Sequence, residues 1–63
     1  MTPAELRTIR NQLGLSQAGL AALLQVGSDR TVRRWEAGER DIPGPAAVAL
    51  KLLAENPDLI DGL

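Results

Sequence analysis

The chain has 63 residues, a formal net charge of −1 and one aromatic residue. A domain of this size holds one small core and has little volume for a deep substrate pocket, so we expect its function on the surface or at an interface. Cysteine and histidine are absent, which excludes disulfides, thiolate chemistry and the commonest metal ligands. We expect no cofactor, no bound metal and no enzymatic activity.

The beginning of the chain and its apolar runs predict neither export nor a membrane anchor. Residues 1–5 lack the basic region and the following apolar stretch of a signal peptide. No apolar run approaches the roughly 20 residues that a membrane span requires. We therefore expect a cytoplasmic protein with no membrane partner.

Charge is distributed unevenly along the chain. Residues 1–40 hold six arginines against four acids, a net charge of +2, whereas residues 41–63 hold one lysine against four acids, a net charge of −3. This pattern is typical of a basic face that binds an anionic polymer, with an acidic surface behind it.

A first helix is predicted over about residues 3–13. Thr2 is a suitable N-cap, Pro3 suits the first helical position, and Glu5 stands where a capping box has its acid. Gly14 is a natural terminator. At helical spacing, one face of this helix carries Leu6, Ile9, Arg10 and Leu13.

Two short helices follow, over about residues 17–25 and 29–37. Ser16 caps the second helix, whose buried stripe consists of Leu20, Ala21 and Leu24. Ser28 is expected to cap the third helix, which buries Val32 and Trp35 and ends at Gly38.

A fourth helix is predicted over about residues 44–55. Pro43-Gly44-Pro45 opens it, since proline is tolerated only in a first turn, and Asn56-Pro57 stops it. The tail, residues 58–63, forms a short turn or frays. With no β pattern along the chain, the predicted class is all-α, a compact domain of four to five helices.

The second and third helices, joined by a tight turn that contains Gly27, form a helix-turn-helix unit. With Val32 and Trp35 inward, the outward positions near the beginning of the third helix are Asp29, Arg30, Arg33 and Arg34. In this geometry the first turns of the recognition helix meet base edges in the major groove, and arginine suits guanine. The alternative is a solvated face, but the like-charged pair of Arg30 and Arg34 favours an anionic partner.

The sequence resembles the helix-turn-helix family of phage repressors and Cro proteins (XRE type) over about residues 4–54. The match implies a single lambda-repressor-like domain over residues 1–63, associated with a bacterial or phage nucleoid. Three features depart from the family pattern: the turn at Val26–Ser28 is one residue longer, Gly19 replaces a good helix former, and little sequence is left to form the family's fifth helix. The resemblance is carried by Arg10, Leu13-Gly14-Leu15-Ser16-Gln17, Leu20-Ala21, Val26, Ser28, Thr31-Val32, Arg34-Trp35-Glu36 and Gly38.

The resemblance implies roles for individual positions. Asp29, Arg30 and Arg34 match positions that read bases, and Arg33 lies between base reading and phosphate contact. Asp29 either accepts a hydrogen bond from a cytosine amino group or simply faces the helix dipole. Arg10 and Glu36 match a structural ion pair between the first and third helices. The expected contacts with the DNA backbone are Gln17, Ser28, Thr31 and Arg40.

The fourth helix is apolar around most of its circumference, and a small monomer can bury only one of its sides. A homodimer is therefore expected, which suits a palindromic operator. The residues proposed for its interface are Val48, Leu52, Leu59, Ile60 and Leu63.

Three functions compete at this stage. The leading one is a dimeric transcriptional repressor that binds double-stranded DNA sequence-specifically and acts by occupying a promoter. The second is an antitoxin-like or other protein-interaction module that also binds DNA. The third, an enzyme, is disfavoured: of the clustered acids Glu36, Glu39 and Asp41, the first is expected to pair with Arg10. Mg²⁺ needs only one or two carboxylates, so composition alone does not exclude it.

Overall fold

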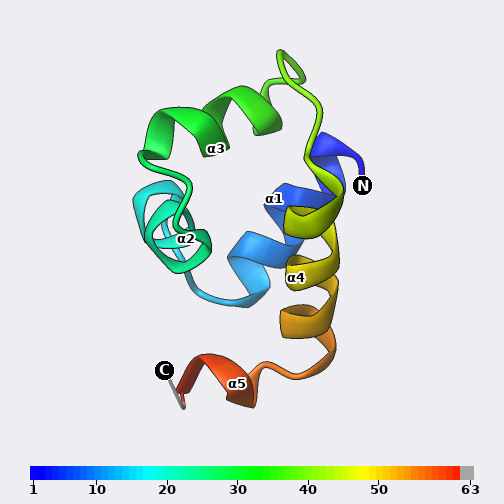
Figure 1. Cartoon of the computed structure of the whole chain (residues 1–63). Helices are drawn as coiled ribbons and strands as arrows, with labels where there is room; N and C mark the ends of the chain where they lie inside the picture. Colours follow the sequence, from blue (N-terminus) through cyan, green and yellow to red (C-terminus); the bar gives the residue numbers. More distant parts are fainter. Residues whose placement is uncertain (62–63) are drawn as a thin grey trace.

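The computed structural model describes the backbone of residues 1–61 and the side chains of residues 1–59. Within these residues there are five helices and no strand, so the predicted all-α class is confirmed (Figure 1). The predicted helices begin at the observed residues and end within one residue of the observed ends. The tail forms a fifth helix of one turn. The helices are α1 (Pro3–Gln12), α2 (Gln17–Leu24), α3 (Asp29–Glu36), α4 (Gly44–Glu55) and α5 (Asp58–Asp61).

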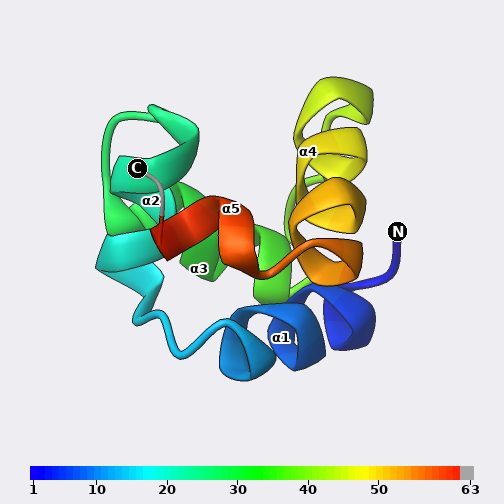
Figure 2. The same cartoon turned by 90° about the horizontal axis from the view of Figure 1, so that it is seen from below.

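Helix α3 lies across one end of the molecule, and α5 lies at the opposite end (Figure 1). Helix α3 packs on α2 and α1, and α1 also packs on α4. Figure 2 shows α5 running from the end of α4 toward the side on which α2 lies. Because α3 packs on α1 and α2, one of its sides faces the body of the domain and its other side faces outward.

Among the described residues, no helix is both long and apolar enough to cross a membrane.

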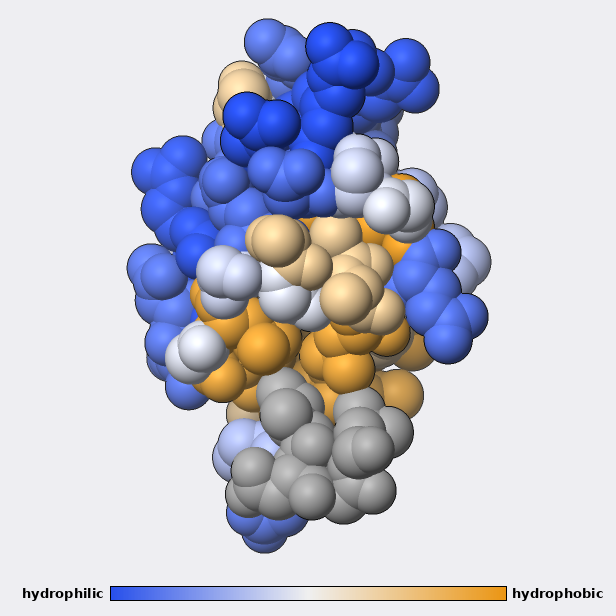
Figure 3. Space-filling model, turned by 90° about the vertical axis from the view of Figure 1, so that its left-hand side faces the viewer, coloured by the Kyte–Doolittle hydropathy of each residue, from blue (hydrophilic) through white to orange (hydrophobic). Residues whose placement is uncertain are grey.

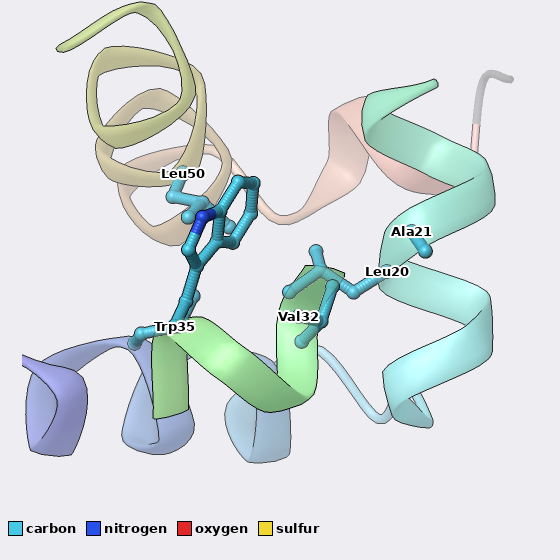
Figure 4. Close-up of a cluster of buried hydrophobic side chains, with 6 residues drawn as sticks. Leu20, Ala21, Val32, Trp35 and Leu50 are labelled. Atoms are coloured by element: carbon cyan, nitrogen blue, oxygen red, sulfur yellow. The ribbon is translucent and has the colours of Figure 1, made fainter. Parts of the chain in front are cut away.

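The core joins helices α1 to α4 (Figure 4). The Trp35 ring reaches from α3 toward Leu50 on α4, while Val32 points toward Leu20 on α2. The predicted burial of Val32 and Trp35 is confirmed, since they are 0% and 3% exposed. Full burial of one such side chain contributes about 1.5–3 kcal/mol, so these two residues fix which side of α3 faces inward. The buried hydrophobic residues are Leu6, Leu20, Ala21, Val32, Trp35 and Leu50.

Two of the three predicted helix caps form as expected. The Thr2 hydroxyl accepts from the Glu5 backbone N–H at 3.1 Å, and the Glu5 carboxylate accepts from the Thr2 N–H at 3.2 Å. The Ser16 hydroxyl accepts from the Gly19 N–H at 2.9 Å. The cap predicted at Ser28 is wrong in one respect, because Ser28 occupies the N-cap position of α3 but its side chain makes no capping hydrogen bond.

The chain reverses between α2 and α3 through two residues with positive φ. Gln25, the C-cap of α2, is left-handed with φ of 57°, and Gly27 follows with φ of 92°. A residue with a Cβ adopts the second conformation only with strain, which explains the glycine. At Gly19 a Cβ would lie 3.2 Å from the Ser16 hydroxyl that caps the helix, a close contact that a small shift of this side chain would relieve.

Candidate nucleic-acid interface

The outward side of α3 carries three arginines on one open surface. Arg30 and Arg33 are exposed and Arg34 is half-buried. The three side chains, with Ala37 and Glu39, line a shallow hollow of about 400 Å³. Figure 3 shows that the end of the molecule formed by α3 and the loop after it is strongly hydrophilic. The arrangement leaves this basic side of α3 free to contact an anionic ligand.

Asp29 and Arg33 form an ion pair on this surface that sequence reasoning did not predict. An Arg33 Nη2 atom lies 3.4 Å from Asp29 Oδ2, one helical turn away, and the two side chains are 57% and 45% exposed. Exposed pairs of this kind contribute little, about 0–1 kcal/mol, so a ligand can separate them easily. Among the described residues, Arg30 and Arg34 have no ion-pair partner.

A buried carboxylate lies behind this surface, at the end of α3. The Glu36 side chain is 3% exposed. Arg10 donates to both of its oxygens, from Nε to Oε2 at 2.7 Å and from Nη2 to Oε1 at 3.2 Å. Arg10 also donates to the Leu15 carbonyl at 3.1 Å, in the loop between α1 and α2. The ion pair expected of these two residues is therefore present, and it links α1 to α3.

Two further side chains reach the same carboxylate. Gln17 Nε2 and Arg7 Nε each donate to Glu36 Oε1 at 3.4 Å. We call Arg7, Arg10, Gln17 and Glu36 the Glu36 cluster. Sequence reasoning missed Arg7, although its spacing of three residues from Arg10 puts both on one side of α1.

The Glu36 cluster also sets the ionisation of its carboxyl group. Burial acts to raise the pKa of Glu36. Hydrogen bonds from Arg10, Gln17 and Arg7, together with the charge of Arg10, outweigh burial and hold the pKa below its ordinary value of 4.5. The carboxylate is therefore charged at neutral pH, and Arg10 compensates that charge.

The four residues expected to contact a DNA backbone lie in different surroundings. Gln17, at the beginning of α2, is half-buried and bound to Glu36. Ser28 is exposed, and the half-buried Thr31 donates from its hydroxyl to the Val26 carbonyl at 3.3 Å. Arg40 is exposed in the loop after α3, where it lines a separate hollow beside the chain start. It is not brought into the hollow that the three α3 arginines share.

Apolar side chains remain uncovered on α4 and α5. Val48, Leu52 and Leu59 are 59%, 51% and 53% exposed. The side chain of Ile60, and Leu63 as a whole, lie outside the described residues. A second apolar feature is a hollow of about 270 Å³ that includes Leu24 of α2, Trp35 of α3 and Ala46 of α4 in its lining. Figure 3 shows that the face over α2 is largely hydrophobic below its hydrophilic end.

Comparison with known proteins agrees with this geometry. Residues 4–54 match the sequence model of a protein family that is described as a helix-turn-helix domain. Antitoxin HigA-2 of Vibrio cholerae serotype O1 is 38% identical over 61 residues, which are 95% of this chain and 57% of that protein. The chain thus spans a little over half the length of this relative. No solved structure matches significantly.

Proposed function

This chain belongs to the helix-turn-helix domain family of DNA-binding domains, and from that premise we propose that it is a sequence-specific, dimeric transcriptional repressor. One observation carries the proposal. The side of α3 that bears Arg30, Arg33 and Arg34 is open, while Val32 and Trp35 anchor its opposite side in the core. A helix presented in this way fits the major groove, which is about 12 Å wide.

In this proposal the first two turns of α3 read bases. Arg30 and Arg34, which have no ion-pair partner among the described residues, each present a planar fork that suits the two acceptors of guanine. Arg33 leaves Asp29 on binding and contacts either a base or a phosphate. The Asp29 carboxylate is then able to accept from a cytosine amino group.

Backbone contacts fix the position of α3 in the groove without reading sequence. We assign these contacts to Gln17 at the beginning of α2, to Ser28 and Thr31 at the beginning of α3, and to Arg40 in the following loop. Gln17 is suited to the role because Glu36 holds its amide group in place. Along the chain, Gln17 and Ser28 precede α3, Thr31 lies in its first turn, and Arg40 follows it.

The exposed apolar residues of α4 and α5 support a homodimer. Val48, Leu52 and Leu59 would be covered by the same surface of a second copy, as a twofold interface requires. A twofold dimer matches a palindromic operator, and occupation of a promoter by such a dimer suffices for repression. Sedimentation of the complex with its site should give two chains per duplex, and one chain per site would contradict the dimer.

Selection of bound duplexes from a random pool tests sequence-specific binding directly. We expect enrichment of a motif with two related halves about 10–10.5 base pairs apart, centre to centre, as two recognition helices on one face of DNA require. Recovery of no motif above the starting pool would contradict sequence-specific recognition.

A second candidate function adds a protein partner to DNA binding. The relative named as an antitoxin, and the apolar hollow beside Trp35 and Ala46, favour an antitoxin-like module that binds another protein. A salt titration separates the two kinds of binding. DNA binding should weaken with a logarithmic slope of about −0.9 per neutralised phosphate, whereas apolar protein association should hardly weaken.

A further inference from the structure

The Glu36 cluster holds one positive charge more than its carboxylate needs. Arg10, whose side chain is 15% exposed, already donates two hydrogen bonds to Glu36. Arg7 adds a second cation but only one long contact, from Nε at 3.4 Å, and its side chain is 59% exposed. Glu36 is buried, at 3% exposed, but this single long contact leaves most of the Arg7 guanidinium open to solvent. The charge of Arg7 is therefore available to a ligand.

The contacts of Arg7 also place it beside Gln17. Both side chains donate to the same oxygen, Glu36 Oε1, at 3.4 Å. Arg7 Nε and Gln17 Nε2 are therefore at most 6.8 Å apart, twice that distance. The single N–H of Arg7 Nε is directed at Glu36, so a phosphate beside the pair would accept from the Arg7 Nη groups and from the second N–H of Gln17 Nε2, each at about 2.9 Å. Among the described residues, the Nη atoms of Arg7 make no hydrogen bond, so they remain free to donate.

We propose that Arg7 binds a DNA phosphate beside Gln17, and that Glu36 is the positioning residue that holds both side chains. The inference rests on the proposed function and extends the contact surface beyond the helix-turn-helix unit onto α1. The ligand is a phosphodiester anion of duplex DNA, which arginine recognises through charge-assisted hydrogen bonds. The contact carries no sequence information, so Arg7 should act equally on cognate and random duplexes.

The test is the salt dependence of duplex binding, followed by fluorescence anisotropy for the wild type and for Arg7→Gln. Loss of one phosphate contact should lower the magnitude of the logarithmic salt slope by about 0.9. Arg7→Lys, which keeps the charge, should restore the slope. Lys51→Gln is the matched control, because it removes one positive charge from an exposed position on α4 and should leave the slope unchanged.

The outcomes separate this inference from the proposed function. If the wild type binds no duplex, the proposed function itself fails. If the wild type binds and Arg7→Gln keeps the same slope, the role of Arg7 is overturned. A loss of slope that Arg7→Lys does not restore, or that Lys51→Gln reproduces, overturns it as well. Urea unfolding of each variant completes the test, because a purely structural role would lower the unfolding midpoint and leave the slope intact.

Discussion

At the scale of single residues, the carboxylate of Glu36 connects three parts of the fold. It receives two hydrogen bonds from Arg10 of α1 and a longer one from Gln17 at the beginning of α2. Glu36 itself lies at the end of α3, so these bonds fix the orientation of α3 relative to α1 and α2. A recognition helix needs such a fixed orientation, because a displacement of its side chains loses contacts with base edges.

Glu36→Gln should destabilise the domain strongly. The substitution leaves the largely buried Arg10 without its counter-charge, and breaking a buried pair in this way costs about 3–5 kcal/mol. The free energy of unfolding, measured in urea, checks the loss. Glu39→Gln is the control, since an exposed residue should change stability by only about 0.5 kcal/mol or less. Equal effects of the two substitutions would contradict a structural role for the buried carboxylate.

Stability should also fall in acid because of Glu36. Its pKa is lower in the folded state than its ordinary value of 4.5, so the unfolded chain binds the proton more tightly. The contribution of Glu36 is therefore complete above about pH 4.5 and is lost as pH falls through the lowered pKa. Urea midpoints measured from pH 7 to pH 2 check this. Hydrogen bonds from Thr2 also lower the pKa of Glu5, so Glu5 would contribute to the same loss of stability in acid. The Glu5→Gln variant keeps Glu36 and should therefore still show most of this loss.

Arg34→Ala should weaken binding to the selected operator by about 1–3 kcal/mol and relax preference at one base position. The reason is the loss of a bidentate contact with a base edge. Affinities for the selected duplex and for a random duplex, measured at one salt concentration, check the prediction. Equal losses on both duplexes would show that Arg34 contacts only the backbone.

At the scale of elements, the helix starts at Pro3, Gln17 and Asp29 could be predicted because each follows a Thr or Ser at the N-cap. The N-cap residue alone does not determine whether its side chain bonds. Ser28 has the right type and position, but no capping bond forms.

The candidate site could be predicted only in part. The outward side of α3 follows from the burial of Val32 and Trp35, which is a matter of helical spacing. The ion pair of Arg10 and Glu36 was predicted from the family resemblance and not from the spacing of the residues. The contact of Arg7 with Glu36 joins residues 29 positions apart, and a local pattern does not contain such a contact.

The two serine caps give a matched pair of substitutions. Ser16→Ala should cost about 1 kcal/mol, because the hydroxyl satisfies the Gly19 N–H at the beginning of α2. Ser28→Ala should cost much less, since its side chain makes no capping bond. Thermal unfolding of the two variants checks the difference. A larger loss for Ser28→Ala than for Ser16→Ala would contradict the observed cap geometry.

At the scale of the whole molecule, the two ends of the domain differ in chemistry. The end formed by α3 is hydrophilic and carries three arginines, whereas exposed apolar residues lie on α4 and α5. In the proposed dimer, this separation would let one surface contact DNA while another contacts a second copy of the chain. It also explains how a chain with a net charge of −1 can present a basic surface.

The most direct test is to map the DNA contact surface by amide chemical shifts of the ¹⁵N-labelled protein, titrated with the selected duplex. We expect the largest shifts at the beginning of α3, in residues 28–34, and at Gln17, with small shifts along the exposed side of α4. This result would place the arginine-bearing side of α3 against the DNA. Shifts confined to α4 and α5, with α3 unchanged, would contradict it.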